Sequence, residues 1–146
     1  MGADCAICAR IEGEAPIYQD AHWCLYPIEA PTPIVGWVYL ASRRHTPGLW
    51  ALEPSEAASL GLALGRVSRA LLEITQAERI YTAALGEAVP HLHLHLVPRM
   101  AEASARGFGL FNAQAEARAG LRSVDPARAQ ACLSALCTAL ADLTDS

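Results

Sequence analysis

A row of three histidines is the part of this sequence best suited to chemistry. His91, His93 and His95 alternate with leucines between Pro90 and Pro98. Strict alternation of this kind predicts a half-buried β-strand, in which successive side chains point to opposite faces. The histidines would then share one face while the leucines face a core. Because imidazole titrates near neutral pH and serves as nucleophile, proton donor or metal ligand, we interpret this stretch as the reactive part of the chain.

The spacing of these histidines limits what they can do together. At a rise of ~3.3 Å per residue, neighbouring histidines stand roughly 6–7 Å apart and the outer pair about 13 Å apart. One metal ion cannot be bound equally by all three, although a neighbouring pair could share one. A solvent-facing strand that carries histidines without function is the plain alternative. The exposed positions hold no Lys, Glu, Ser or Thr, which argues against that alternative.

Three further segments predict strands that would pair with the histidine stretch. Residues 22–29 and 34–41 contain β-branched and aromatic side chains and flank a proline-rich turn, so they predict a hairpin. Residues 79–85 predict another strand, which leads through a turn into the histidines.

Two segments predict helices. Residues 54–75 begin with a first-turn proline and carry an apolar stripe at helical spacing, formed by Ala57, Leu60, Leu64, Val67, Leu71 and Ile74. Residues 125–143 begin with an Asp-Pro pair suited to an N-cap and first turn, and their stripe consists of Leu133, Leu136, Leu140 and Leu143. Residues 101–124 predict a loop with a short helix. Since no repeat or linker divides the chain, we expect residues 1–146 to form a single α+β domain.

Composition excludes several classes of protein. A chain of 146 residues is long enough to bury a real core. Its formal net charge of −4 argues against non-specific binding to nucleic acid, which needs a basic face. No apolar run approaches the ~18 residues of a membrane span, and the N-terminus lacks a signal-peptide pattern. We therefore expect a cytoplasmic protein with neither nucleic acid nor membrane as partner.

The cysteines do not suggest a disulfide framework. There are five, an odd number, and no secretory signal accompanies them. Cys24, Cys132 and Cys137 lie in apolar segments and are expected to be ordinary buried thiols. Cys5 and Cys8 form a Cys-x-x-Cys pair, which occurs in redox motifs, in zinc sites and by chance in helices.

The histidine stretch resembles the signature of the histidine triad (HIT) family of nucleotide hydrolases and transferases. That signature is His-φ-His-φ-His-φ-φ, with φ apolar, and residues 91–97 match every position. The resemblance covers the chain to about residue 99, and residues 100–146 add a loop and a C-terminal helix. It implies an α+β fold with an antiparallel sheet of about five strands, a long central helix and a C-terminal helix. It also implies a homodimer and a covalent nucleotidyl-histidine intermediate.

In zinc-containing members of the family, a Cys-x-x-Cys pair binds the metal together with two histidines. One histidine follows the second core strand, and the other is the first of the triad. The corresponding residues here are Cys5, Cys8, His45 and His91. The resemblance therefore implies a structural zinc ion, and four unrelated residues are the alternative.

The resemblance also implies the catalytic roles. The middle histidine, His93, would be the nucleophile, with its far nitrogen protonated so that the near nitrogen keeps a lone pair. His95 would donate to a phosphate oxygen or to the leaving group. The substrate would be a nucleoside phosphoramidate, a dinucleoside polyphosphate or a similar nucleotide conjugate, cleaved at its α-phosphate.

A nucleotide site is implied at two turns. Glu29 lies where the family carries an acidic residue that holds the ribose hydroxyls, and two acceptor oxygens suit a diol. A solvated turn carboxylate is the other interpretation of Glu29. In the turn that contains Gly86 and Glu87, the family usually has an Asn, a Gln near Glu87 and a Ser near Ala88, all of which contact phosphate. Backbone N–H groups around Gly86 could hold phosphate oxygens, whereas an ionised Glu87 would repel them.

Departures from the family pattern leave other functions open. Trp37 stands where many members have a fourth histidine, and it would either fill core or stack on a base. Ala88 removes a hydroxyl donor, and the turn holds no Asn. Together with Glu87, these departures favour a catalytically weak nucleotide-binding protein as one alternative. A zinc metalloenzyme with His93 and His95 as direct ligands is another. The base, the leaving group and the choice between hydrolase and transferase stay open.

Overall fold

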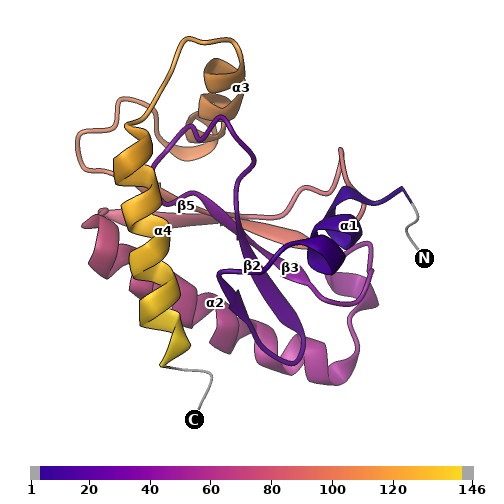
Figure 1. Ribbon diagram of the computed structural model, residues 1–146. Coiled ribbons are helices and arrows are strands. Elements are labelled where there is room, and N and C mark those ends of the chain that lie inside the picture. The colour runs from indigo at the N-terminus through magenta and orange to yellow at the C-terminus, as the bar shows by residue number, and fades with distance from the viewer. Residues whose placement is uncertain (1–3, 143–146) are drawn as a thin grey trace.

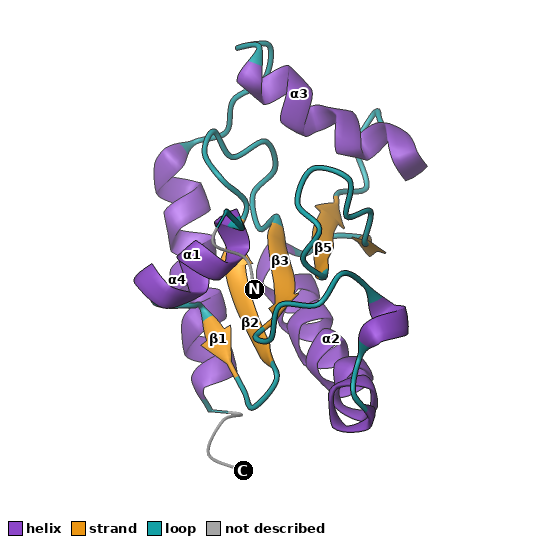
Figure 2. Cartoon of the chain, turned by 90° about the vertical axis from the view of Figure 1, so that its right-hand side faces the viewer, coloured by secondary structure: helices purple, strands orange, loops and turns teal. Residues whose placement is uncertain are grey.

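The computed structural model describes residues 4–142, which form one antiparallel sheet covered by helices (Figure 1, Figure 2). The five strands lie in the order β1-β2-β3-β5-β4. Their bounds are Tyr18–Gln19 for β1, Trp23–Pro27 for β2, Val38–Ser42 for β3, Arg79–Ala83 for β4 and His93–Arg99 for β5. The predicted α+β class with an antiparallel sheet of about five strands is confirmed.

Helices lie on both faces of the sheet. Their bounds are Ala6–Gly13 for α1, Pro54–Thr75 for α2, Ala113–Arg118 for α3 and Pro126–Ala141 for α4, and short 3₁₀ segments occupy Leu49–Ala51 (η1) and Gly107–Asn112 (η2). In Figure 1, α2 passes beneath the sheet and α3 lies above it. The predicted long central helix and C-terminal helix are confirmed. Within residues 4–142, no helix combines the length and the apolar character needed to cross a membrane.

The main core lies between the sheet and the pair of helices α2 and α4. Leu92, Leu94 and Leu96 all belong to it, and each is at most 6% exposed. They meet side chains of α2 and α4 such as Leu71 and Leu136. Since burying a leucine side chain contributes about 1.5–3 kcal/mol, this side of the histidine stretch stabilises the sheet. The prediction that these leucines face a core is confirmed.

Several local predictions were wrong. Ala57 is exposed, and the neighbouring Glu56 is buried instead. Cys137 is exposed, whereas the other two thiols expected in the core are buried. Helix α1 and strand β1 were not predicted, because eight and two residues carry too little periodicity to detect. Leu143, assigned to the stripe of the last helix, lies outside the described residues.

Strand β3 begins four residues later than its composition suggests. Gly36 adopts a φ of +84°, a left-handed conformation that favours glycine, so the chain turns before it enters the sheet. A Cβ atom at this position would lie 3.1 Å from side-chain atoms of both Pro98 and Thr75. The turn therefore needs glycine for its conformation and for the space available.

Strand β5 begins at His93 and does not include the first histidine. The backbone N–H of His91 donates to the Val89 carbonyl oxygen at 2.8 Å, and that of Leu92 donates to the Thr46 carbonyl oxygen at 2.7 Å. Neither bond belongs to the regular β3–β5 ladder. The spacing expected for three histidines on one strand consequently applies only to His93 and His95.

An ion pair connects the loop after β3 to the start of α2. Arg44 Nε and Nη2 donate to the two carboxylate oxygens of Glu56 at 2.9 and 2.7 Å. The Glu56 carboxylate also accepts the backbone N–H of Glu53, which completes the N-terminal cap of α2. The hydrogen bonds from Arg44, with that backbone N–H, lower the pKa of Glu56 to about 2.

Replacement of this carboxylate should produce a pH-dependent loss of stability. Because the pKa of Glu56 is lower in the folded than in the unfolded chain, its stabilisation is complete above about pH 4.5 and disappears as the pH falls towards 2. We expect Glu56→Gln to lower the free energy of unfolding by about 1–2 kcal/mol at pH 7. Urea titrations at pH 7 and pH 3 measure this, with the exposed Glu73→Gln as control. An equal loss of unfolding free energy at pH 7 and pH 3 would contradict the stabilising role of the ionised Glu56 carboxylate.

Candidate active site and metal site

Four metal-ligating side chains converge where the start of the chain meets the loop after β3. The ligand atoms of Cys5, Cys8, His45 and His91 all lie within 4.8 Å of one another. Cys5 is the N-cap of α1, and its sulfur accepts the backbone N–H of Cys8 at 3.5 Å. A Cys-x-x-Cys pair at a helix start places both sulfurs on the same side of one turn. The structure thus brings together the four residues that the family resemblance assigned to zinc.

The distances within this cluster fit a tetrahedral zinc site. Cys5 Sγ lies 3.5 Å from His91 Nδ1, and Cys8 Sγ lies 3.4 Å from the same nitrogen and 3.3 Å from His45 Nδ1. Zinc bonds of ordinary length to sulfur and nitrogen, at the tetrahedral angle, place the two atoms about 3.6 Å apart. The donor set, two thiols and two imidazoles, is also one that structural zinc sites use.

The orientation of His91 suits a metal ligand. Its side chain is fully buried, and Nε2 lies 2.7 Å from the Ser42 carbonyl oxygen. A carbonyl can only accept, so Nε2 carries the proton and Nδ1 keeps its lone pair towards the sulfurs. Burial lowers the pKa of His91, which keeps the imidazole neutral and able to ligate.

The other two histidines lie on the opposite side of the sheet from the main core. His93 Nδ1 lies 2.7 Å from the His91 carbonyl oxygen. By the same reasoning Nδ1 holds the proton of neutral His93, and Nε2 has a free lone pair. The rings of His93 and His95 are 5.1 Å apart between centroids and meet edge to face. Two neighbouring imidazoles with different hydrogen-bond partners can therefore take different roles.

Both histidines line a cavity of about 200 Å³. Its lining comes from several separate parts of the chain. Besides the two histidines, it consists of Ala6, Ile7, Ile28, Glu29, Tyr39, Ala88, Val89, Gln114 and Arg118. The cavity thus contains two imidazoles, one carboxylate and one guanidinium group. These groups can bind a negatively charged substrate that also carries polar groups, and an imidazole among them can attack it.

Tyr39 connects this cavity to α1. It pairs with His95 across the β3–β5 ladder, and its ring meets His93 edge to face at 5.7 Å between centroids. Arg10 donates to the Tyr39 hydroxyl oxygen at 3.0 Å and to the Pro27 carbonyl oxygen at 2.8 Å. Burial raises the pKa of Tyr39, so its hydroxyl stays neutral. The Tyr39 ring packs against the imidazoles of both His93 and His95.

Trp37 lies directly against His95. Its side chain is 2% exposed, and Nε1 donates to His95 Nδ1 at 3.0 Å. Burial, together with the nearby His93, lowers the pKa of His95 to about 4. The interpretation of Trp37 as a core residue is confirmed, and an indole so buried cannot stack on a base. Its hydrogen bond to His95 was not predicted.

The residues expected to bind nucleotide do not all line the cavity that contains His93 and His95. Glu29 lines the same cavity as His93 and His95. Gly86 lines a second, smaller cavity of about 120 Å³, which His93 shares. Glu87 is exposed and lies outside the lining of both cavities within the described part of the chain. The turn before β5 is thus only partly involved in the candidate site.

Three polar residues of the cavity, Tyr39, Gln114 and Arg118, were not predicted from the sequence. Tyr39 could have been found, because alternation along β3 places it opposite the buried Leu40 and on the face of the histidines. Gln114 and Arg118 are four residues apart and share one side of α3. No local pattern indicates that this short helix covers the histidine face, so these two depend on tertiary structure.

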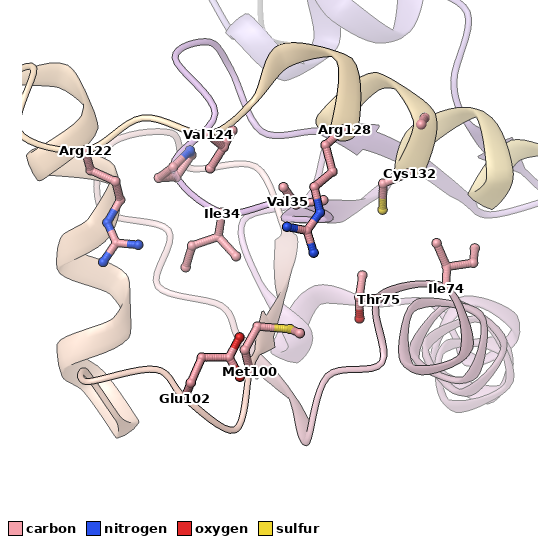
Figure 3. Close-up of a pocket in the computed structure, with 12 residues that line it drawn as sticks. Ile34, Val35, Ile74, Thr75, Met100, Glu102, Arg122, Val124, Arg128 and Cys132 are labelled. Atoms are coloured by element: carbon pink, nitrogen blue, oxygen red, sulfur yellow. The ribbon is translucent and has the colours of Figure 1, made fainter.

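A larger groove, of about 420 Å³, lies elsewhere (Figure 3). It is bounded by residues 33–35 before β3, by the end of α2 and by the start of α4. Its lining is mostly apolar, with Arg122, Arg128 and Glu102 at its border, and none of the three histidines belongs to it. His93 and His95 line the smaller cavity instead.

The chain is similar to several known proteins. No family model matches the sequence. The adenylylsulfatase HINT3 of Arabidopsis thaliana is 28% identical over 104 residues, which are 66% of this chain and 52% of that protein. The chain thus spans about half the length of this curated relative.

Solved structures extend the similarity to the whole chain. A zinc-bound histidine triad family protein from Mycobacterium smegmatis is 27% identical, covers 99% of both chains and has a TM-score of 0.71. The chain therefore resembles histidine triad proteins in both sequence and fold. A histidine triad protein from Bradyrhizobium japonicum is 26% identical, with a TM-score of 0.66 over 88% of this chain and 92% of that one. In this chain the three histidines are divided between two sites, since His91 joins the cysteines while His93 and His95 line the cavity.

Proposed function

We propose that this protein belongs to the histidine triad family and is a nucleotide hydrolase or nucleotidyl transferase that cleaves its substrate at the α-phosphate through a covalent nucleotidyl-His93. The observation that carries the proposal is the 2.7 Å contact between His93 Nδ1 and the His91 carbonyl oxygen. It leaves the lone pair of Nε2 free on a side chain that lines a cavity with His95 and Glu29. A neutral imidazole with a fixed tautomer is an effective nucleophile near pH 7.

The reaction would proceed in two displacements. In the first, the Nε2 lone pair attacks the α-phosphorus, an N–P bond forms, and the bond to the leaving group breaks with its electrons going to that group. In the second, water attacks the phosphorus, the N–P electrons return to Nε2, and the water proton passes to solvent. An acceptor phosphate in place of water would make the protein a transferase. His95 would donate a hydrogen bond to the charge that develops on phosphate oxygen.

Binding of the nucleotide would use both turns and α3. Glu29 offers two acceptor oxygens to the ribose hydroxyls, and backbone N–H groups at Gly86 would face phosphate oxygens. Glu87, expected in the nucleotide site, adds only negative charge there. Arg118 would supply the positive charge that this turn lacks, because its side chain lines the cavity beside the histidines.

The adenylylsulfatase relative suggests the first substrate to test, adenylyl sulfate. Its hydrolysis yields adenosine monophosphate and sulfate. Phosphoramidates and dinucleoside polyphosphates present the same α-phosphate to His93 with other leaving groups. A panel of these three classes would identify the leaving group that the cavity accepts.

The metalloenzyme alternative has less support. Among the described residues, the only group of at least three His, Cys, Asp or Glu side chains close enough to share an ion is the one formed by Cys5, Cys8, His45 and His91. His93 and His95 thus lack a third protein ligand. The alternative of a catalytically weak nucleotide-binding protein draws its support from the exposed Glu87 and from Ala88, and it predicts binding without turnover.

A single variant tests the nucleophile. His93→Ala should abolish turnover, because no other imidazole of the cavity has its lone pair free, whereas His95→Ala should slow the reaction about 10²–10³-fold through loss of one donor. Quenching during turnover, followed by peptide mass spectrometry under neutral conditions, should find a nucleoside monophosphate on His93. His22→Ala is the control for loss of a histidine elsewhere. Near-normal turnover by His93→Ala would refute the mechanism.

The proposal also assigns a structural zinc ion to Cys5, Cys8, His45 and His91. Bound there, zinc would stabilise the fold by linking α1 to the segments beside β3 and β5. The ion would hold His91, whose carbonyl oxygen in turn orients His93. The zinc-bound relative from Mycobacterium smegmatis supports this assignment.

Removal of the two thiolates tests the metal site. The double variant Cys5→Ser/Cys8→Ser should lose zinc and melt at a lower temperature than the parent, because binding free energy of a structural metal is folding free energy. Elemental analysis should give close to one zinc per parent chain. Cys137→Ser, which removes an exposed thiol outside the cluster, should keep metal and melting temperature. Full metal retention by the double variant would exclude this ligand set.

Dimerisation is a further part of the proposal. Strand β4 lies at the end of the sheet, so its outer edge is unpaired within residues 4–142. Helix α2 packs against β4 and exposes Leu62 and Leu72, which are 59% and 38% accessible. A second copy could bury both features in one symmetric interface. Cytoplasmic localisation likewise stays a prediction.

Light scattering tests the oligomeric state. The parent chain should have the mass of a homodimer at micromolar concentration, and Leu62→Glu/Leu72→Glu should have the mass of a monomer, because buried charge in an apolar interface is costly. Leu121→Glu places the same charge on another exposed leucine, outside α2 and β4, and should stay dimeric. A monomeric parent would contradict the proposal.

A further inference from the structure

A hydrogen bond connects the buried Trp37 to His95 in the candidate active site. We propose that Trp37 is a positioning residue that holds His95 as a neutral Nε2–H donor, so that the active site favours leaving groups that depart without taking up a proton. The preference for certain leaving groups rests on the proposed function. The hydrogen bond itself does not depend on any activity.

The direction of this hydrogen bond is determined by chemistry. An indole nitrogen is only a donor, and Trp37 Nε1 lies 3.0 Å from His95 Nδ1. Nδ1 must therefore present its lone pair, and the single proton of neutral His95 resides on Nε2. Rotation of the imidazole by 180° would place a carbon atom in front of the donor. The contact thus selects both the ring orientation and the tautomer.

Trp37 itself is held rigidly. Its ring lies among the buried residues Ile28, Val97 and Leu110, and it meets Phe111 edge to face at 5.7 Å between centroids. Its backbone carbonyl oxygen accepts the N–H of Ile28 at 3.1 Å. The indole cannot turn away from His95 without opening this cluster. The N–H donor is consequently a permanent feature of the site.

Few groups around His95 would stabilise the protonated, positively charged form of its imidazole. Tyr39 and His93 contact the ring, and the cavity adds the carboxylate of Glu29 and the guanidinium group of Arg118. Protonation of Nδ1 would set one N–H against another, and burial opposes the charge as well. Both effects act in the direction of the lowered pKa of about 4. His95 therefore stays neutral over the physiological range.

A neutral imidazole N–H stabilises negative charge but is a very weak acid. It can donate a hydrogen bond to a phosphate oxygen as charge develops there. It cannot deliver the proton that an amine needs to leave a phosphoramidate. Sulfate, pyrophosphate and nucleoside polyphosphates leave as anions and need no proton. The site should therefore prefer mixed anhydrides such as adenylyl sulfate over phosphoramidates.

Nuclear magnetic resonance tests the tautomer without any substrate. Two-bond ¹H–¹⁵N correlation spectra of the zinc-loaded chain, with His95 assigned by a His95→Gln variant, should show the proton on Nε2 from pH 8 to pH 5. Trp37→Phe keeps an aromatic ring and removes the donor. In this variant His95 should become a mixture of tautomers, and its titration midpoint should rise by about one pH unit.

Trp23→Phe is a matched control. Trp23 is also fully buried and also donates from Nε1, to Ser59 Oγ at 2.9 Å, but it lies in the main core. Its replacement should lower stability while leaving the His95 spectrum unchanged. At pH 5.5, the ratio of kcat/KM for adenylyl sulfate to kcat/KM for adenosine phosphoramidate should fall about tenfold in Trp37→Phe and stay constant in Trp23→Phe.

The outcomes separate this inference from the proposed function. A proton on Nδ1 of His95 in the parent chain overturns the inference, as does a Trp37→Phe variant whose tautomer and titration match those of Trp23→Phe. If Trp37→Phe does not fold, the parent spectrum alone decides. Absence of turnover on every nucleotide would refute the proposed function, and the spectra would still decide the role of Trp37.

Discussion

The pairing of β3 with β5 is the interaction on which the rest of the structure depends. Its register places Leu40 opposite Leu94 on the core side, and Tyr39 opposite His95 on the cavity side. Because side chains alternate with a period of two, a slip by one residue would turn the leucines outward and bury the histidines. Burial of the leucines therefore determines which way the reactive side chains point. The core and the candidate active site are two faces of one ladder.

Three chemically identical side chains acquire different properties from the groups that contact them. His91 donates from Nε2 to the Ser42 carbonyl oxygen, His93 donates from Nδ1 to the His91 carbonyl oxygen, and His95 accepts at Nδ1 from Trp37. The remaining nitrogen differs accordingly. Nδ1 of His91 presents a lone pair to the thiols, Nε2 of His93 has a free lone pair, and Nε2 of His95 carries the proton. These contacts form a chain in which His91 supplies the acceptor that orients its neighbour. A displacement of His91 within the Cys–His cluster would thus reach the candidate nucleophile through one peptide group.

Few charged side chains line the cavity of His93 and His95. Arg44 and Arg99 lie near the strands but are engaged by Glu56 and Glu78 at 2.7 and 2.8 Å. These arginines strengthen the fold and are not available to a substrate anion. Arg118, on the short helix over the histidine face, is the cation that lines the cavity. The position of α3 therefore determines where Arg118 lies relative to the two histidines. Ala113, the first residue of α3, packs in the same buried cluster as Trp37.

The sequence by itself determined the elements whose signal is local. The alternation around the histidines, the apolar periodicity of residues 54–75 and the Asp-Pro start of the last helix each specify a structure within a few turns or one strand, and all three are present. The candidate nucleophile and the four candidate metal ligands could also be named from the family resemblance. Only the tertiary structure decided that His91 leaves the strand, that α3 covers the cavity and that Trp37 bonds to His95. Such contacts join residues far apart in the chain, and their energy comes from packing and hydrogen bonds that no local pattern records.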